Sequence, residues 1–484
     1  MGLLGILIGL LLLVWLAFRG WSVLVLAPAA ALVAAAFGGQ PLLASWTQIF
    51  MGSAATFLAQ FFPLFLLGAV FGKLMEDSGS VTTVANFMTK TLGKSRAMLA
   101  VVLAGAAVTY GGVSLFVAFF VLAPMAQTLF RAAAIPGRLM PAAIILGTST
   151  FTMSALPGTP SIQNAIPMPF FGTTPFAAPG LGIVAAIIML GFGLWWLHRA
   201  EQAARRRGES FGAETSAQPD AAADDEHVRE RATAAREFDP AEIHRGHQSE
   251  TTPSILVAAL PLGVVVAVNL AMSFIVLPRL DSSFLSEERF GGTSITAVAG
   301  VWSVVVALAA AIVVVVVCNR GRLPALRQSV DAGANASALP ALSVASLVGF
   351  GAVVAALPAF AAVRDLVVGI EGGPLVSLAV ATNVLAALTG SASGGLTIAL
   401  DALGTTYMKL AAETGVSPAL MHRVAVIGAG TLDLLPHNGA VVSLLAICGV
   451  SHRQGYMDIV MVGIVSAIIA LVAVIALGSA FGSF

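Results

Sequence analysis

The sequence predicts an all-α polytopic membrane protein built from two inverted-topology repeats, each with about five spanning helices and one re-entrant hairpin. Of the 484 residues, 58% are hydrophobic and only 10% are charged, whereas a soluble domain carries about 25% charged residues. Many apolar tracts reach the roughly 20 residues that a helix needs to cross a bilayer, without the alternating pattern of a membrane barrel. The third observation is a weak sequence similarity between the two halves.

The apolar tracts define the expected membrane segments in order. The first half contains spans near 2–18, 21–37, 53–75, 139–170 and 177–198, with a broken hairpin at 97–130. The second half repeats this order with spans near 254–278, 295–318, 334–362, 419–450 and 455–482, and a broken hairpin at 374–410. The apolar run at the N-terminus lacks the basic leader and cleavage site of a secretory signal, so we expect it to be the first span.

A charged stretch divides the two membrane halves. Residues 198–250 hold 12 of the 24 acidic residues and 8 of the 24 basic ones. This stretch contains too few apolar residues to form a hydrophobic core, so its composition favours a linker over a folded domain. We therefore expect a first membrane repeat over 1–198, a cytoplasmic linker over 199–252 and a second repeat over 253–484.

The two halves share short motifs in the same order. "TYGGVSL" and "SASGGLTI" align so that Gly111 and Gly112 fall on Gly394 and Gly395, and "SALPGTP" aligns with "DLLPHNG". Such short similarities also arise by chance in apolar sequence, but the charges support a repeat. Basic residues follow the first "GAVF" helix and precede the matching "GAVV" helix, so the positive-inside rule predicts opposite orientations. The resulting topology places both termini outside and leaves only five basic residues there: Arg279, Arg289, Arg364, Lys409 and Arg423.

The tips of the two broken hairpins are the first candidate site. Their arms are too short to span, and their glycines break the helix, which leaves backbone amides without a partner inside it. Free backbone at membrane depth is tolerated where it lines a cavity, and helix amino-termini attract anions. The alternative is a packing motif in which small residues let helices approach closely. The candidate substrate-binding residues are Gly111, Gly112 and Ser114 in one tip, and Thr389, Ser391, Ser393, Gly394 and Gly395 in the other.

Two proline-containing segments form the second candidate site. "TMSALPGTPSIQNAI" offers Thr159, Ser161 and Asn164, and "GTLDLLPHNGAVVSLL" offers Asn438 and Gly439 for substrate binding. Ionisable groups at membrane depth are typical of pathways and proton relays, so Asp433 and His437 are the candidate proton-coupling pair. The alternative is that His437 only hydrogen-bonds to Asp433 as a structural contact.

Other features argue against an enzyme. The sequence contains no phosphate-binding loop, catalytic triad or cofactor fingerprint. We expect no catalytic residue, no metal, no cofactor and no nucleic-acid partner. The polar group of "GKLMEDSGS", with Lys73, Glu76 and Asp77, is interpreted as the exposed cytoplasmic end of a helix.

Several motifs resemble those of a known family. "FLLGAVFGKLMEDSGS" resembles the GntP family of gluconate:proton symporters. "TGSASGGLTIAL" and "GTLDLLPHNGAVVSLLAICG" resemble its 3-hydroxybutyrate and short-chain hydroxy-acid permease branch. The resemblance covers essentially the whole membrane part. It implies a proton-coupled importer of small organic acid anions in the cytoplasmic membrane, with an elevator-type architecture and a homodimer among membrane lipids.

The functional prediction is a proton-coupled importer of a short-chain hydroxy or oxo monocarboxylate such as 3-hydroxybutyrate, or of a sugar acid such as gluconate. In this mechanism the hairpin tips bind the carboxylate, and Asn438 and Asn164 hold the substrate hydroxyl. The rival is a sodium-coupled di- or tricarboxylate symporter, because the same hydroxyl and amide groups are suitable sodium ligands. An anion channel and a membrane sensor are further alternatives.

Overall fold

The structure is a computed structural model that describes residues 2–19, 21–209, 211, 239–242, 244–436 and 438–484. Within these ranges every regular element is a helix. Six of the described helices are long and apolar enough to cross a membrane, or seven when a pair bent by 104° (Ser80–Leu92 with Lys94–Tyr110) counts as one span. The six run over Leu42–Asp77, Pro179–Arg206, Ile255–Arg279, Ile295–Cys318, Leu326–Ala356 and His452–Phe481. The chain is therefore an all-helical, multi-pass membrane protein.

The helices of the first half lie close to the predicted segments. They are α1 (Gly2–Phe18), α2 (Val23–Phe37), α3 (Leu42–Ala44), α4 (Met51–Asp77), α5 (Ser80–Leu92), α6 (Ala97–Tyr110), α7 (Leu115–Ala132), α8 (Met140–Thr148), α9 (Phe151–Ser154), α10 (Ile162–Ala165), α11 (Pro167–Phe171) and α12 (Pro179–Arg206). A π-helical segment over Ser45–Phe50 joins α3 to α4 in one rod. The amphipathic α5 is absent from the prediction, because its 13 residues are too few to span.

The second half follows the same order of elements. Its helices are α14 (Ile255–Ala271), α15 (Ile295–Cys318), α16 (Leu326–Ala356), α17 (Phe360–Val368), α18 (Gly373–Thr389), α19 (Ala392–Thr414), α20 (Pro418–Thr431), α21 (Gly439–Ile447), α22 (His452–Ile459) and α23 (Ser466–Phe481). A 3-10 turn over Leu432–Leu434 follows α20, and a π-helical segment over Val460–Val465 joins α22 to α23.

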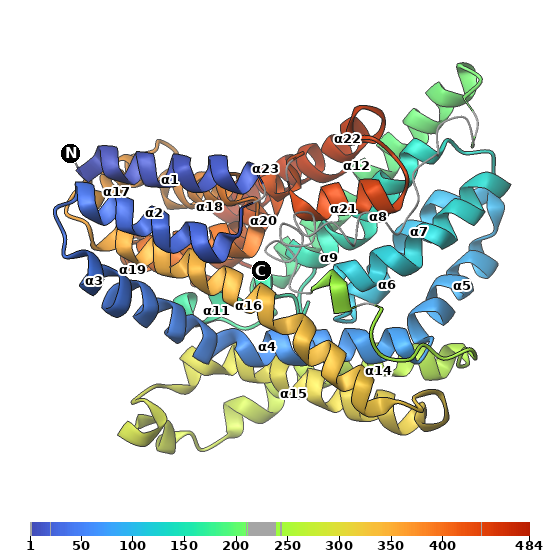
Figure 1. Cartoon of the computed structure of the whole chain (residues 1–484), viewed down its shortest axis with the longest axis horizontal. Helices are drawn as coiled ribbons and strands as arrows, with labels where there is room; N and C mark the ends of the chain where they lie inside the picture. Colours follow the sequence, from blue (N-terminus) through green and yellow to red (C-terminus); the bar gives the residue numbers. More distant parts are fainter. Residues whose placement is uncertain (1, 20, 210, 212–238, 243, 437) are drawn as a thin grey trace.

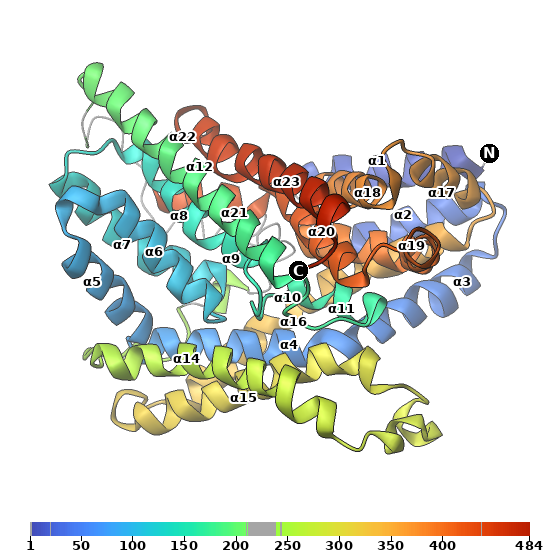
Figure 2. The same cartoon turned by 180° about the vertical axis from the view of Figure 1, so that it is seen from behind.

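Figure 1 and Figure 2 show how these helices are arranged. Helices α4, α14, α15 and α16 lie together along one side of the molecule, where α4 packs along α16 and also contacts α15. On the other side, the α6–α7 hairpin stands at one end, and the α18–α19 hairpin with α1, α2 and α17 stands at the opposite end. The long α4 and α16 therefore form a base that connects the two ends.

Each hairpin has a non-helical tip that points toward the middle of the molecule. The tip between α6 and α7 covers residues 111–114, and the tip between α18 and α19 covers 390–391. The predicted breaks in the following segments are confirmed, since helix is interrupted between α9 and α10 and again before α21. These segments also cross over, because α10 contacts α19 and α21 contacts α7. Each hairpin is thus in contact with the broken segment of the other half.

The two N-terminal helices are shorter than a typical span. α1 has 17 residues and α2 has 15, against the roughly 20 that cross the hydrocarbon core. The two pack against each other, and α2 also contacts α16. That they cross the membrane stays a prediction.

Candidate functional site

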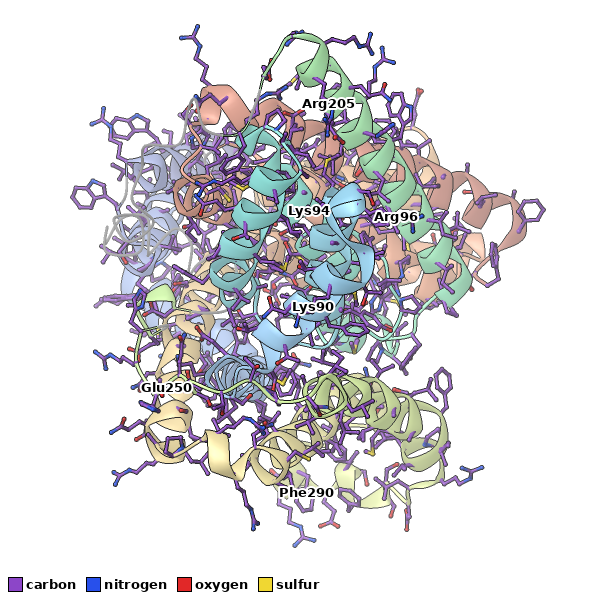
Figure 3. All side chains as sticks on the ribbon, turned by 90° about the vertical axis from the view of Figure 1, so that its right-hand side faces the viewer. Lys90, Lys94, Arg96, Arg205, Glu250 and Phe290 are labelled. Atoms are coloured by element: carbon purple, nitrogen blue, oxygen red, sulfur yellow. The ribbon has the colours of Figure 1, made fainter. Side chains whose placement is uncertain are left out.

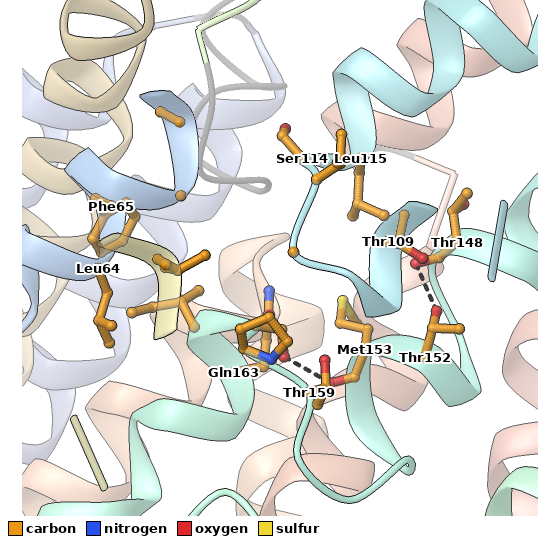
Figure 4. A pocket seen from close by; sticks show the side chains of 18 residues that line it. Leu64, Phe65, Thr109, Ser114, Leu115, Thr148, Thr152, Met153, Thr159 and Gln163 are labelled. Atoms are coloured by element: carbon orange, nitrogen blue, oxygen red, sulfur yellow. Dashed lines mark hydrogen bonds between the residues drawn. The ribbon is translucent and has the colours of Figure 1, made fainter. Parts of the chain in front are cut away.

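A cavity lies where the tip of the first hairpin meets the broken segment after α8 (Figure 4). It encloses about 60 Å³, which is room for a few water molecules or one small solute. Helices α4 and α15 close its other sides. The lining residues are Leu64, Phe65, Gly68, Ala69, Thr109, Gly112, Val113, Ser114, Leu115, Thr148, Thr152, Met153, Thr159, Pro160, Ser161, Ile162, Gln163 and Leu308.

Three polar side chains of this cavity have no hydrogen-bond partner among the described residues: Ser114, Thr159 and Gln163. Thr159 is 0% exposed and Gln163 is 1% exposed, and both amide atoms of Gln163 are unpaired. A buried polar group without a partner costs about 1–3 kcal/mol, so native proteins keep few of them. A solute that offers hydrogen-bond donors and acceptors would supply the missing partners.

The hydroxyl groups deeper in the cavity wall are already used. Thr148 donates to the carbonyl of Ile144 at 2.8 Å, and Thr152 donates to the carbonyl of Thr148 at 3.1 Å (Figure 4). Ser161, one of the predicted binding residues, donates to the carbonyl of Met153 at 2.9 Å. Each hydroxyl has a single hydrogen to donate, so these three groups cannot donate to a solute without breaking a backbone contact.

The glycines of the first tip are required by its geometry. Gly112 has a φ of +97°, a conformation that other residues rarely adopt, and a Cβ there would lie 3.2 Å from the ring of Pro160. At Gly111 a Cβ would lie 2.3 Å from the side chain of Leu262. The two glycines therefore let the tip close against the broken segment on one side and against α14 on the other.

A buried arginine holds the wall behind the cavity. Arg423 on α20 is 0% exposed and donates to the carbonyl of Ala177 at 2.7 Å and to the carbonyl of Ser154 at 3.1 Å. It forms no ion pair within the part of the chain that the structure describes. Its Nη1 also lies 3.5 Å from Oδ1 of Asn164. The positive charge is thus stabilised by carbonyl oxygens and not by a carboxylate.

Asn164, a predicted binding residue, lies behind the cavity and does not line it. Its Nδ2 donates to the carbonyls of Thr159 and Pro175, both at 3.0 Å, and its Oδ1 lies 3.2 Å from Nε2 of His422. The other ring nitrogen of His422 lies 2.6 Å from the hydroxyl of Thr173. Every polar atom of the Asn164 side chain is therefore engaged in holding the segment that carries Thr159.

Arg423, which the predicted topology places on the outer side of the membrane, is buried inside the protein. The helix α20 begins at Pro418 and carries Arg423 into the protein interior, next to Gly182 of α12, where a Cβ would lie 3.3 Å from Nε of Arg423. Sequence reasoning counted this residue among the five outer basic residues, at the start of the span near 419–450. The pair of His422 and Arg423 inside the apolar run "LMHRVAVIGAGT" is the signal that could have indicated a buried polar network.

The tip of the second hairpin is closed by protein groups. Oδ1 of Asp433 accepts the backbone N–H of Ala392 at 3.0 Å and an N–H of the Asn438 amide at 2.9 Å. Asn438 also donates to the carbonyl of Gly390 at 2.9 Å and accepts the N–H of Ala440 at 2.8 Å, which caps α21. A carboxylate of the chain itself thus occupies the amino end of α19, the position where an anion was predicted.

The hydroxyl groups of the second tip bond to one another and to the backbone. Thr389 donates to the carbonyl of Leu385 at 2.8 Å. Ser391 accepts the N–H of Gly394 at 3.1 Å and so caps α19, and its Oγ lies 3.2 Å from that of Ser393. Unlike the hydroxyl of Ser114 in the first tip, which is unpaired among the described residues, these hydroxyl groups have hydrogen-bond partners within their own hairpin.

The remaining predicted residues of the second half serve packing or fall outside the described ranges. A Cβ at Gly395 would lie 2.3 Å from the backbone nitrogen of Ala386, so this glycine lets α18 and α19 approach closely. This is the packing role that the sequence left open. Gly439 is the buried first residue of α21. His437 lies outside the residues that the structure describes.

A charged cluster on α4 is buried, contrary to the prediction of an exposed helix end. Lys73 and Asp77 are 0% exposed and Glu76 is 5% exposed; Nζ of Lys73 lies 3.3 Å from Glu76 and 3.0 Å from Asp77. The segment before α14 covers this cluster, with Gln248 donating to Oε1 of Glu76 and the N–H of Ser249 to the Asp77 carbonyl. Burial of these charges is compensated mainly by the pairing of Lys73 with the two carboxylates.

Comparison with known proteins adds a family and a curated relative. Residues 1–194 match the family described as GntP family permease. Over 486 aligned residues the chain is 38% identical to an uncharacterized transporter, YxjC of Bacillus subtilis, with 99% of each chain covered. Both similarities are to permeases or transporters and not to enzymes.

One solved transporter structure shares the fold. The structure of MtrF from Neisseria gonorrhoeae, described as illuminating a class of antimetabolite efflux pumps, aligns with a TM-score of 0.52 at 14% identity, over 89% of this chain and 83% of that one. The YdaH transporter of Alcanivorax borkumensis aligns with a TM-score of 0.46, also at 14% identity, over 89% of this chain and 88% of that one. The family match over residues 1–194 and the relative that aligns over 99% of both chains together show that this chain belongs to the GntP family of permeases.

Proposed function

We propose that this permease is a proton-coupled importer of a short-chain hydroxy or oxo monocarboxylate, with 3-hydroxybutyrate as the first candidate and gluconate as the second. The observation that carries the proposal is the cavity with the unpaired side chains of Ser114, Thr159 and Gln163. These groups supply two hydroxyls and one amide, which suit the carboxylate and hydroxyl of such an acid. The rest of the wall is largely apolar, with Leu64 and Leu308 facing the same space.

The size of the cavity favours the smaller substrate. The volume of about 60 Å³ is well below the roughly 300–1,000 Å³ of typical ligand sites. A compact acid therefore requires less widening of the cavity than a six-carbon sugar acid with hydroxyl groups on every side. Gluconate would also need more hydrogen-bonding partners than the three unpaired side chains offer. We therefore place 3-hydroxybutyrate first.

Two sources of positive potential support an anionic substrate. Arg423 lies behind the wall and is linked to it through Asn164, whose Nδ2 donates to the carbonyl of Thr159 at 3.0 Å. The amino end of α7 begins directly after the tip at Ser114 and adds the partial positive charge of a helix amino-terminus. An unpaired buried cation acts over several ångströms at low dielectric, so it favours an anion in the cavity without touching it.

Proton coupling is assigned to the second tip, at Asp433 with His437. As a carboxylate, Asp433 accepts the N–H groups of Ala392 and Asn438. Protonation would weaken both hydrogen bonds, because a charged acceptor binds more strongly than a neutral one. The proposed consequence is that a proton loosens the closed tip and links its movement to substrate binding in the other half.

The same proposal includes the larger arrangement. The units are a first membrane repeat over 1–198, a cytoplasmic linker over 199–252 and a second repeat of inverted topology over 253–484. Support comes from the hairpin and broken segment that occur in the same order in each half. A mobile unit that carries the hairpins would move against α4, α14, α15 and α16 in an elevator mechanism, with a homodimer in the cytoplasmic membrane as the assembly.

The decisive experiment is uptake of radiolabelled 3-hydroxybutyrate and gluconate into proteoliposomes under an inward proton gradient in sodium-free buffer. Accumulation that a protonophore abolishes is the expected result. Accumulation that requires sodium would instead identify a sodium-coupled symporter, and citrate is then the substrate to test. Equilibration without accumulation would indicate a channel. Failure of all three acids with both ions would contradict the proposal and leave a sensor as the alternative.

The coupling assignment has its own test. Asp433→Asn and His437→Gln should each remove the response of uptake to external pH, whereas counterflow exchange of labelled substrate continues. Uphill uptake with an unchanged pH profile in His437→Gln would exclude that histidine as the coupling group, and the same result in Asp433→Asn would exclude the aspartate.

A further inference from the structure

A second cavity lies at the basic end of the molecule, away from the candidate substrate site. It encloses about 380 Å³ between the turn that joins α5 to α6, the turn after α7, and the last turns of α12. Figure 3 shows this end, with Lys90, Lys94, Arg96 and Arg205 on the face toward the viewer. None of its lining residues lines the smaller cavity.

The rim of this cavity is positively charged. Lys94 and Arg96 are exposed, and neither forms an ion pair within the described ranges. Arg205 donates to Glu201 at 2.7 Å and to the carbonyl of Ala133 at 3.2 Å, so the only acidic residue of the lining is already paired. Lys94 and Arg96 therefore have no counter-ion among the residues that the structure describes. The backbone at the start of α6, which begins at Ala97, also lines the cavity and presents the positive end of that helix.

The floor of the cavity is apolar. Met98 and Leu99 contribute from α6, and Leu194 and Leu197 contribute from α12. A freely soluble anion such as phosphate gains no binding free energy from this apolar surface. A molecule with a charged head and an apolar body does gain it, because its apolar part is removed from water. The lining therefore combines a phosphate-binding rim with a hydrocarbon-binding floor.

An exposed apolar stripe of α12 lies beside this floor on the same helix. Ile183, Ile187 and Trp195 are 47%, 65% and 53% exposed, and their spacing of four and eight residues puts them on one helix face. Such a face is suited to contact with lipid, and tryptophan is typical of the level of the headgroups. A chain lying along this stripe would reach the cavity at the end of the helix where Trp195 lies.

We propose that this cavity binds the headgroup phosphate of an anionic phospholipid, with the acyl chains along α12. Lys94 and Arg96 contact the phosphate, and the half-buried Leu99 and Leu194 contact the glycerol and the first methylenes. Basic residues at the end of membrane helices attract anionic lipids by about 1 kcal/mol each. The inference stands apart from the proposed substrate, because it uses neither the hairpin tips nor their cavity.

The test uses the full-length protein in detergent. Its thermal unfolding is followed with added phosphatidylglycerol, with phosphatidylcholine, and with inorganic phosphate, and native mass spectrometry counts the retained lipids. Phosphatidylglycerol should raise the Tm and remain bound, and phosphatidylcholine should do neither. In the double variant Lys94→Gln/Arg96→Gln, binding of phosphatidylglycerol should weaken roughly 10- to 30-fold. The control Lys90→Gln/Arg327→Gln removes two exposed charges outside the cavity and should bind as the native protein does.

Three results would overturn the proposal. An equal rise in Tm with inorganic phosphate would identify a site for soluble anions. Equal weakening in the two double variants would show that general surface charge is responsible. A native protein that retains phosphatidylcholine as well as phosphatidylglycerol would contradict the proposal without any variant, so a folding defect in a variant cannot leave it undecided.

Discussion

The two hairpin tips carry similar sequences but differ in what their polar groups contact. The first tip lines a cavity in which Ser114, Thr159 and Gln163 have no partner among the described residues. In the second tip, Asp433 and Asn438 bond to the backbone of residues 390–392. The polar groups of the first tip therefore face a cavity, whereas those of the second tip are already bonded to other groups of the protein.

This difference indicates a division of labour between the halves. An open cavity with unpaired groups is less stable than a filled one and gains from a ligand. A closed network is stable by itself and responds when one of its charges changes. If this interpretation is correct, substitutions in the first half reduce uptake without reducing stability, and substitutions in the second half reduce stability as well.

The largest effect is expected from Arg423, which connects the two halves. Arg423→Gln removes the donors to the carbonyls of Ala177 and Ser154 and leaves both buried without a partner. At about 1–3 kcal/mol for each of the two unpaired carbonyls, the loss should total roughly 2–6 kcal/mol and lower the Tm in detergent. Arg423→Lys keeps the charge but loses the forked donors of the guanidinium group. Its Tm should therefore lie between those of the native protein and Arg423→Gln. A Tm for Arg423→Gln equal to that of the native protein would contradict the buried network.

The next largest effect is on transport. Thr159→Val and Gln163→Leu each remove a hydrogen bond to the charged substrate, worth about 1.5–3 kcal/mol, so uptake efficiency should fall roughly 10- to 100-fold. Their Tm should stay unchanged or rise, because each change removes a buried polar group that lacks a partner.

Thr152→Val is the matched control in the same cavity. Its hydroxyl already donates to the carbonyls of Gly147 and Thr148, so it has no hydrogen to offer to a substrate. Uptake by this variant should stay within a few-fold of the native rate. If Thr152→Val loses as much uptake as Thr159→Val, the distinction between hydroxyl groups with and without a hydrogen-bond partner is wrong.

The smallest effect is expected in the closed tip. Asn438→Ala removes the cap of α21 and the contact with Gly390, which should cost about 0.5–2 kcal/mol and lower the Tm modestly. Asn383→Ala is the control, because that amide donates only to the carbonyl of Ala379 one turn earlier in its own helix. Equal Tm values for the two variants would argue against a closed tip held by Asn438.

Sequence reasoning located the tips and breaks of the fold well. Gly111 ends α6, and Pro157 and Pro436 lie in the breaks, as predicted. Gly394 and Gly395 lie inside α19, and the second tip breaks at Gly390 instead. Whether each polar group has a hydrogen-bond partner was not predictable from local sequence. Whether Thr159 has a partner depends on residues far away in the sequence, as does the contact of Asp433 with Ala392.

The buried charges show the same limit. Lys73 was predicted at a cytoplasmic helix end and Arg423 on the outer side of the membrane, and neither prediction included burial inside the protein. In the fold, Lys73 pairs with two carboxylates of its own helix, and Arg423 meets carbonyls of the broken segment. Such compensation comes from tertiary structure, which composition and spacing do not encode.

The segment that covers the charged cluster of α4 also has a consequence for the evolution of this family. Gly246 has a φ of +92°, and a Cβ there would lie 2.4 Å from Oδ2 of Asp77. Insertions or side chains at this position would uncover a lysine and two carboxylates, which are costly to expose within a membrane. Drift in length is therefore expected to be excluded between Gly246 and Ser249, so that this short segment diverges more slowly than exposed loops of the same chain.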